Sequence, residues 1–157
     1  MNKKIIIVAG DPNSINSEII SKSWKKIKTP LKKKLYLVAN FNLVNKQLKK
    51  IKSQIPIYKI KNKNENPYTK KLKIIDVPLN FKNPFNVPLK NSRHYIIKCL
   101  NLAHQLSVRK DVKGLINCPI NKRLLNNTKT IGVTEFLASK NRINNGSEVM
   151  LIHNRKL

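Results

Sequence analysis

The sequence contains few cysteines and acidic residues and no long apolar segments. Its two cysteines, Cys99 and Cys118, lack the CxxC spacing of a metal or redox motif and are too few for a disulfide framework, so we expect buried thiols. No stretch approaches the roughly 20 apolar residues of a membrane-spanning helix, and the apolar run at 5–9 is too short for a signal-peptide core. These absences predict a globular, cytoplasmic protein.

Because acidic residues are scarce, the chain is strongly basic. Seven Asp and Glu residues stand against 33 Lys and Arg residues, which gives a formal net charge of +26. Such a surface attracts phosphate backbones. However, the lysines are scattered and accompany abundant Asn and Ile, as A/T-rich coding would produce at solvated positions, and no aromatic residues interleave with the clusters at 25–26, 32–34 and 49–50. We therefore favour solvated lysines over a nucleic-acid face and expect any DNA or RNA binding to be weak and non-specific.

Apolar segments alternate with amphipathic ones along the chain. Runs rich in Ile, Val and Leu predict strands at 5–9, 35–39, 55–60, 72–77, 112–118 and 148–152. The best predicted helix is 91–107, on which His94 lies in the polar stripe and is expected to be solvated, while His104 borders the apolar face and is expected at the edge of the core. The alternation predicts one α/β region over 1–157, with a largely parallel sheet and flanking helices.

Two strand-to-helix junctions carry the residues best suited to a ligand. GDPNSINSEII at 10–20 predicts a tight loop followed by a helix. At the second junction, Pro119 suits the first turn of a helix, and Lys122, one turn further, could pair with a phosphate, although a solvated lysine explains the pattern equally well. Residues 132–135 are expected to open a short helix in which Thr134 caps the end or offers its hydroxyl to a ligand.

These segments resemble the 4-hydroxythreonine-4-phosphate dehydrogenase family. GDPNSINSEII is similar to that family's GDPAGIGPEI-type opening, PINK at 119–122 to its PINK stretch, and GVTEFLA at 132–138 to its GHTEFLA stretch. Asn91, Ser92 and Arg93 resemble the start of the family's NG-R-type helix. The order and separation of the motifs agree over nearly the whole chain. The resemblance implies the isocitrate and isopropylmalate dehydrogenase-like fold, present here as about its N-terminal half.

The resemblance also implies a chemistry. Members of the family oxidise 4-phosphooxy-L-threonine with NAD in pyridoxal phosphate (vitamin B6) biosynthesis, and a divalent metal, Zn, Mg or Co, polarises the alcohol that is oxidised. The active site of the family lies across a homodimer interface. In this chain the resemblance assigns substrate binding to Thr134 and, with the cleft expected at the ends of neighbouring strands, to Lys122.

The chain also departs from the family pattern. Val133 stands where the family has its substrate-binding histidine, and the opening loop has Asn and Ser where Ala, Gly and Pro are usual. The family's three metal histidines lie further along than Leu157, and His153 falls too early to be one of them. We therefore assign no catalytic or metal-binding residue and expect an incomplete or inactive oxidoreductase as this chain alone. The alternative is a non-catalytic remnant that binds phosphate-bearing ligands, or nucleic acid non-specifically.

Overall fold

A computed structural model describes residues 3–62, 65, 67, 69–125, 132–141, 149 and 151. Its elements are, in chain order, β1 (Lys4–Val8), α1 (Asn16–Lys26), α2 (Thr29–Lys32), β2 (Leu35–Ala39), α3 (Phe41–Lys50), β3 (Ile57–Lys59), β4 (Leu72–Asp76), α4 (Leu89–Ser107), β5 (Val112–Asn117), the 3-10 helix η1 (Lys122–Leu124) and α5 (Val133–Ala138). The strand predicted at 148–152 lies largely outside the described residues. Within the described part, no helix is long and apolar enough to span a membrane.

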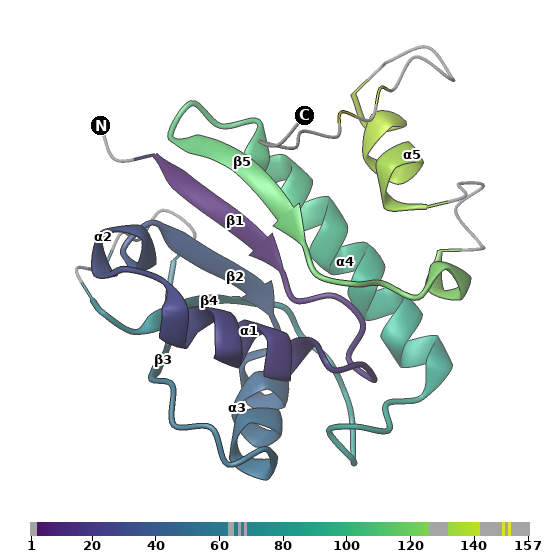
Figure 1. Ribbon diagram of the computed structural model, residues 1–157. Helices are drawn as coiled ribbons and strands as arrows, with labels where there is room; N and C mark the ends of the chain where they lie inside the picture. Colours follow the sequence, from purple (N-terminus) through teal and green to yellow (C-terminus); the bar gives the residue numbers. More distant parts are fainter. Residues whose placement is uncertain are drawn as a thin grey trace.

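The strands form one parallel sheet, as the alternating pattern predicted, and the structure gives their order as β3-β4-β2-β1-β5. Helices α1 and α3 lie on one face of the sheet, and α4 crosses the other (Figure 1). Because both faces are covered, strand β2 reads as a continuous apolar run, and all five of its residues are buried.

Alternate residues of the central strands enter two different cores. In β1, Ile6 and Val8 join the core beneath α4, whereas Ile5 and Ile7 face α1 and α3. On the other side of the sheet Trp24 of α1 is buried, with 4% of its surface exposed. Each fully buried large apolar side chain contributes about 1.5–3 kcal/mol relative to an exposed one. The period-2 alternation therefore fixes the register of the sheet.

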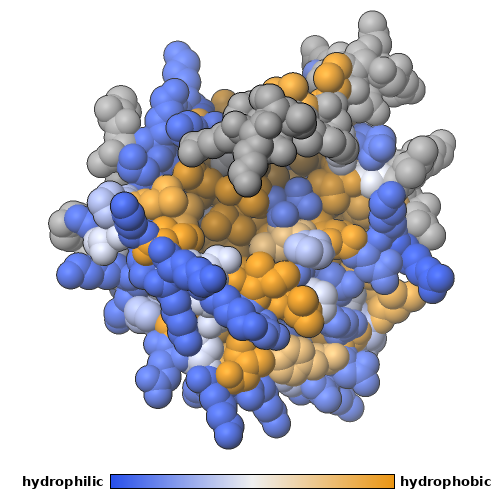
Figure 2. Space-filling model, viewed as in Figure 1, coloured by the Kyte–Doolittle hydropathy of each residue, from blue (hydrophilic) through white to orange (hydrophobic). Residues whose placement is uncertain are grey.

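Strand β5 is one of the two edges of the sheet and is covered less than its neighbour β1. It pairs with β1 on one side, and no described strand pairs with its other side. Ile116 lies beside Ile7 in the register but is 54% exposed. Figure 2 shows apolar surface between α1 and β5, on the part of the sheet that α1 does not cover.

Lys73 contradicts the expectation that the lysines are solvated. It lies in β4 beside Tyr36, with 1% of its surface exposed. Its Nζ donates to the Lys33 carbonyl and lies 4.2 Å from the centroid of the Tyr36 ring. Burial, helped by the charge of Lys4, lowers the pKa of Lys73 to about 8. The strand containing Lys73 was nevertheless predicted correctly. The aliphatic stem of this lysine packs like an apolar side chain and is therefore compatible with a buried strand position.

Replacing Lys73 with methionine should remove a pH dependence of stability. The lowered pKa means that the unfolded chain binds more protons between about pH 8 and 10.5, so the wild-type free energy of unfolding rises with pH across that window. We expect Lys73→Met to lose about 1–3 kcal/mol of this rise. Urea unfolding at pH 7 and pH 10.5 measures it, with exposed Lys98→Met as the control. An unchanged pH slope in Lys73→Met would contradict the assignment.

Candidate functional site

The loops after β1 and β5 meet at the carboxyl edge of the sheet, where open α/β proteins bind ligands. Gly10 has a φ of +79°, a conformation that glycine adopts without strain. The next residue, Asp11, donates its N–H to the Pro119 carbonyl over 3.1 Å, and Cys118 donates its N–H to the Val8 carbonyl over 2.9 Å. The two predicted junctions are therefore in direct contact.

Side chains close the loop that follows β1. Asn16, 3% exposed, donates from Nδ2 to the Pro119 carbonyl over 2.8 Å. Gln47 of α3 donates to the carbonyls of Pro12 and Pro84 over 2.7 and 2.6 Å. The Asn16 Oδ1 and the Ser17 Oγ are buried without a protein partner beside a small hollow under the loop. The residues that replace the family's small ones thus fill the loop rather than open it to a ligand.

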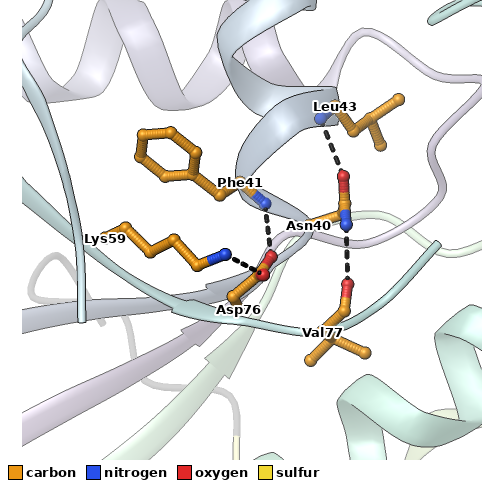
Figure 3. Close-up of polar contacts among 6 residues, drawn as sticks. All are labelled: Asn40, Phe41, Leu43, Lys59, Asp76 and Val77. Carbon is orange, nitrogen blue, oxygen red and sulfur yellow. Dashed lines mark hydrogen bonds and ion pairs between the residues drawn. The ribbon is translucent and has the colours of Figure 1, made fainter. Parts of the chain in front are cut away.

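The ends of β2 and β4 are occupied by structural hydrogen bonds (Figure 3). Asn40 accepts from the Leu43 N–H at 2.8 Å, which caps α3, and its Nδ2 donates to the Val77 carbonyl at 2.9 Å. Asp76 accepts from the Phe41 N–H at 2.8 Å and pairs with Lys59 at 2.7 Å. The Asp76 carboxylate is therefore held at a helix N-terminus, where negative charge is favoured, and is engaged in the fold.

Lys122 is the first residue of η1, and its side chain is exposed. The expectation that Pro119 opens a helix is wrong: residues 119–121 are not helical, and Asn121 caps η1 by accepting from the Arg123 N–H at 3.0 Å. Leu124, 2% exposed, anchors the short helix in the core beneath α4. The geometry leaves the Lys122 ammonium in solvent next to the carboxyl edge.

Thr134 is the second residue of α5 and is exposed. Thr134 does not cap the helix, because the N-cap position is occupied by Gly132, which has no side chain to cap it with. Phe136 is 3% exposed and fixes α5 on the core, and Val133 packs partly buried against the same core. Val133 is thus an apolar contact in this chain. No hydrogen bond joins Lys122 to Thr134 in the described part, and whether the two share one cleft remains a prediction.

Arg93 contacts the segment of η1, and the sequence analysis gave it no role of its own. From α4 its Nη2 donates to the Arg123 carbonyl over a long 3.3 Å, and its Nε is buried without a partner. These two donors form the edge of the guanidinium that binds carboxylate or phosphate bidentately. The resemblance of Asn91, Ser92 and Arg93 to a family helix was the signal that could have identified it.

The described cysteines and histidines range from fully buried to exposed. Cys99 is 1% exposed as predicted, whereas Cys118 is only half-buried, and burial raises the pKa of the two thiols to about 12 and about 11. His94 is exposed, as the polar stripe predicted. His104 is half-buried at the core edge, and its Nε2 lies 2.8 Å from the Asn141 Oδ1, which ties α4 to the chain after α5. His153 lies outside the described residues.

The described residues offer no metal site of the kind that the resemblance implies. Over the described ranges, no three His, Cys, Asp or Glu side chains are grouped as metal ligands would be. Beside Gly10 the Asn16 side chain and the Pro119 carbonyl already fill the space that a methyl group would take, so the loop after β1 is closed on that side. We derive no step through a metal or NAD.

Helices on both faces of a parallel sheet, with polar loops meeting at its carboxyl edge, define an α/β protein of the kind that binds ligands at that edge. The family model described as pyridoxal phosphate biosynthetic protein PdxA matches residues 31–157. The chain therefore belongs to this family. A search of curated proteins found no match.

Solved structures agree with this family. A protein from Salmonella typhimurium assigned as a 4-hydroxythreonine-4-phosphate dehydrogenase is 25% identical, with a TM-score of 0.73 over 88% of this chain and 44% of its own. Dehydrogenases of the same name from Burkholderia phymatum and Klebsiella pneumoniae are 18% and 21% identical, with TM-scores of 0.73 and 0.71, and 43% and 44% of their chains are covered. The chain thus has part of the isocitrate dehydrogenase-like fold and spans less than half the length of these relatives.

Proposed function

We propose that the chain supplies the phosphate-binding side of a dehydrogenase site, in a protein that oxidises 4-phosphooxy-L-threonine with NAD during pyridoxal phosphate biosynthesis. Family membership supports the reaction class. The observation that carries the proposal is the contrast between buried and exposed side chains within η1 and α5. Buried Leu124 and Phe136 anchor these two short helices, while Lys122 and Thr134 of the family-like motifs stay exposed.

The side chains of Lys122, Arg93 and Thr134 would bind and orient the substrate phosphate. Lys122 contributes a mobile point charge, and Arg93 a second cation whose Nε–H has no protein partner. Thr134 contributes a hydroxyl that can donate to a third oxygen. Charge-assisted hydrogen bonds of this kind are about twice as strong as neutral ones, so the phosphate would fix the position of the carbon to be oxidised.

The remainder of the site would come from residues other than those described, including a second subunit of a homodimer. Two observations support this part of the proposal. The chain spans less than half the length of its solved relatives, and Ile116 of the edge strand β5 is exposed. The chain alone is therefore expected not to reduce NAD. The second candidate, a non-catalytic binder of phosphate-bearing ligands, is favoured by Val133, which packs against the core where the family motif has histidine.

Replacing Lys122 with alanine should weaken binding of 4-phosphooxy-L-threonine to the full chain about 5- to 15-fold, because one charge-assisted contact contributes about 1–1.6 kcal/mol at an exposed site. Isothermal titration calorimetry measures the dissociation constant. Lys113→Ala, which removes an equal charge from an exposed position in β5, is the matched control and should change it less than about twofold. Equal losses in both variants would reduce Lys122 to general surface charge and contradict the proposal.

A further inference from the structure

A groove enclosing about 500 Å³ lies at the amino-terminal edge of the sheet, at the opposite ends of the strands from the candidate site. Its walls come from the end of α1, from α2 and from the segments before β3 and β4. We call it the four-lysine groove, because Lys25, Lys32, Lys52 and Lys70 all line it. Its size is within the range of small-molecule sites, about 300–1,000 Å³.

The four lysines come from four separate segments and are not neutralised. No carboxylate lines the groove, and none of its lysines forms an ion pair within the described residues, where the paired cations are Lys4, Lys22, Lys59 and Arg109. Like charges that converge on one hollow repel each other unless an anion lies between them. Thr29 and Gln54 add neutral hydrogen-bonding groups to the same wall.

Lys52 occupies a backbone position at which glycine would be less strained. It follows α3 with a φ of +54°, the left-handed conformation that ends a helix in a Schellman motif. Its N–H donates to the Lys49 carbonyl at 3.1 Å, and the Ser53 N–H donates to the Leu48 carbonyl at 2.9 Å. A side chain in this conformation is disfavoured relative to glycine. The chain therefore keeps a cation at the groove at a cost in backbone strain.

A second lysine-lined hollow shows what lysine abundance alone produces. It is lined by Lys46, Lys49, Lys50 and Lys82, and three of these four come from the single helix α3. Lysines three and four residues apart on one exposed helix face are a consequence of amphipathicity. The four-lysine groove differs, because its cations converge from separate segments. The second hollow provides a control with the same charge.

We propose that the four-lysine groove binds a small anion that carries several phosphate groups, of the size of inorganic triphosphate. This site is separate from the substrate-phosphate site and does not depend on it. The groove also contains its own reporter: Trp24, the single tryptophan of the chain, is among its lining residues, and the Lys32 Nζ lies 5.3 Å from the centroid of its ring. An anion that draws Lys32 away from the ring should change the tryptophan emission.

The test is a titration of the full chain with inorganic triphosphate at physiological salt, followed by Trp24 fluorescence and by calorimetry. We expect saturable one-site binding, and a loss of at least about tenfold in affinity in the double variant Lys52→Gln/Lys70→Gln. The control Lys49→Gln/Lys50→Gln loses the same charge and should change the affinity less than about threefold. If the first variant does not fold, Lys25→Gln/Lys32→Gln replaces it.

Three results would overturn the proposal. The first is an equal loss in both double variants, which would indicate diffuse attraction to a basic surface. The second is binding that does not saturate. The third is tighter binding of a single-stranded DNA with the same number of phosphates, which would make the groove part of a nucleic-acid surface. Because 4-phosphooxy-L-threonine is not used, failure here leaves the Lys122 test unaffected.

Discussion

Replacing Gly10 with alanine is expected to lower the free energy of unfolding by about 3 kcal/mol or more. A left-handed φ of +79° costs an L-residue about 1–2 kcal/mol. The new methyl group would also lie 2.5 Å from the Pro119 carbonyl and closer still to the Asn16 Nδ2, so the loop after β5 would have to shift. That shift would weaken the hydrogen bonds that join the two loops of the candidate site.

Urea unfolding of the full chain measures this effect, and Gly114→Ala is the matched control. Gly114 lies in β5, and a methyl group there would meet no heavy atom within 4 Å. Its replacement should be neutral or stabilise the protein by up to about 0.5–1 kcal/mol, because the unfolded chain loses freedom. A Gly10→Ala protein as stable as Gly114→Ala would contradict the closed arrangement of the two loops.

Replacing Asn40 with alanine should cost about 2–3 kcal/mol. The substitution removes the cap of α3, which contributes about 1 kcal/mol. It also leaves the Val77 carbonyl without its donor in a buried setting, since Asn40 itself is only 6% exposed. The Asn40 N–H would keep its bond to the Tyr95 hydroxyl at 2.9 Å. Thermal and urea unfolding should therefore show a folded but weakened protein.

Asn121→Ala tests whether burial causes the size of this effect. Asn121 caps η1 in the same way, accepting from the Arg123 N–H at 3.0 Å, but it is exposed. We expect a loss of about 0.5–1 kcal/mol, since water can take over the bonds of an exposed cap. Losses of the same size at the two positions would show that the bond from Asn40 to Val77 contributes little.

The elements that could be predicted from the sequence are those whose residues agree with their surroundings. The run at 35–39 was predicted as a strand because every position is apolar, and all five residues are buried between two helical layers. The helix predicted at 91–107 is present as Leu89–Ser107, and its earlier start follows from Pro88, which takes the cap position. The resemblance of three motifs then placed the strands in a family fold that the comparisons confirm.

The features that could not be predicted are polar residues whose role depends on a distant partner. Ile15 is apolar but 65% exposed, while the polar residues Asn16 and Ser17 at the start of α1 are buried. Asn16 contacts Pro119, which is 103 residues away in the chain. Lys73 is the same kind of case, because its burial beside Tyr36 comes from tertiary contacts that outweigh the local pattern.

The central proposal is that the motifs of η1 and α5 hold a substrate phosphate, and NMR mapping of the isotope-labelled full chain tests it most directly. Saturating 4-phosphooxy-L-threonine should shift the amide signals of Asn121, Lys122, Thr134 and Glu135 most, together with the side-chain Nε–H signal of Arg93. Shifts spread evenly over the exposed lysines, or centred on the four-lysine groove with η1 and α5 unaffected, would contradict it.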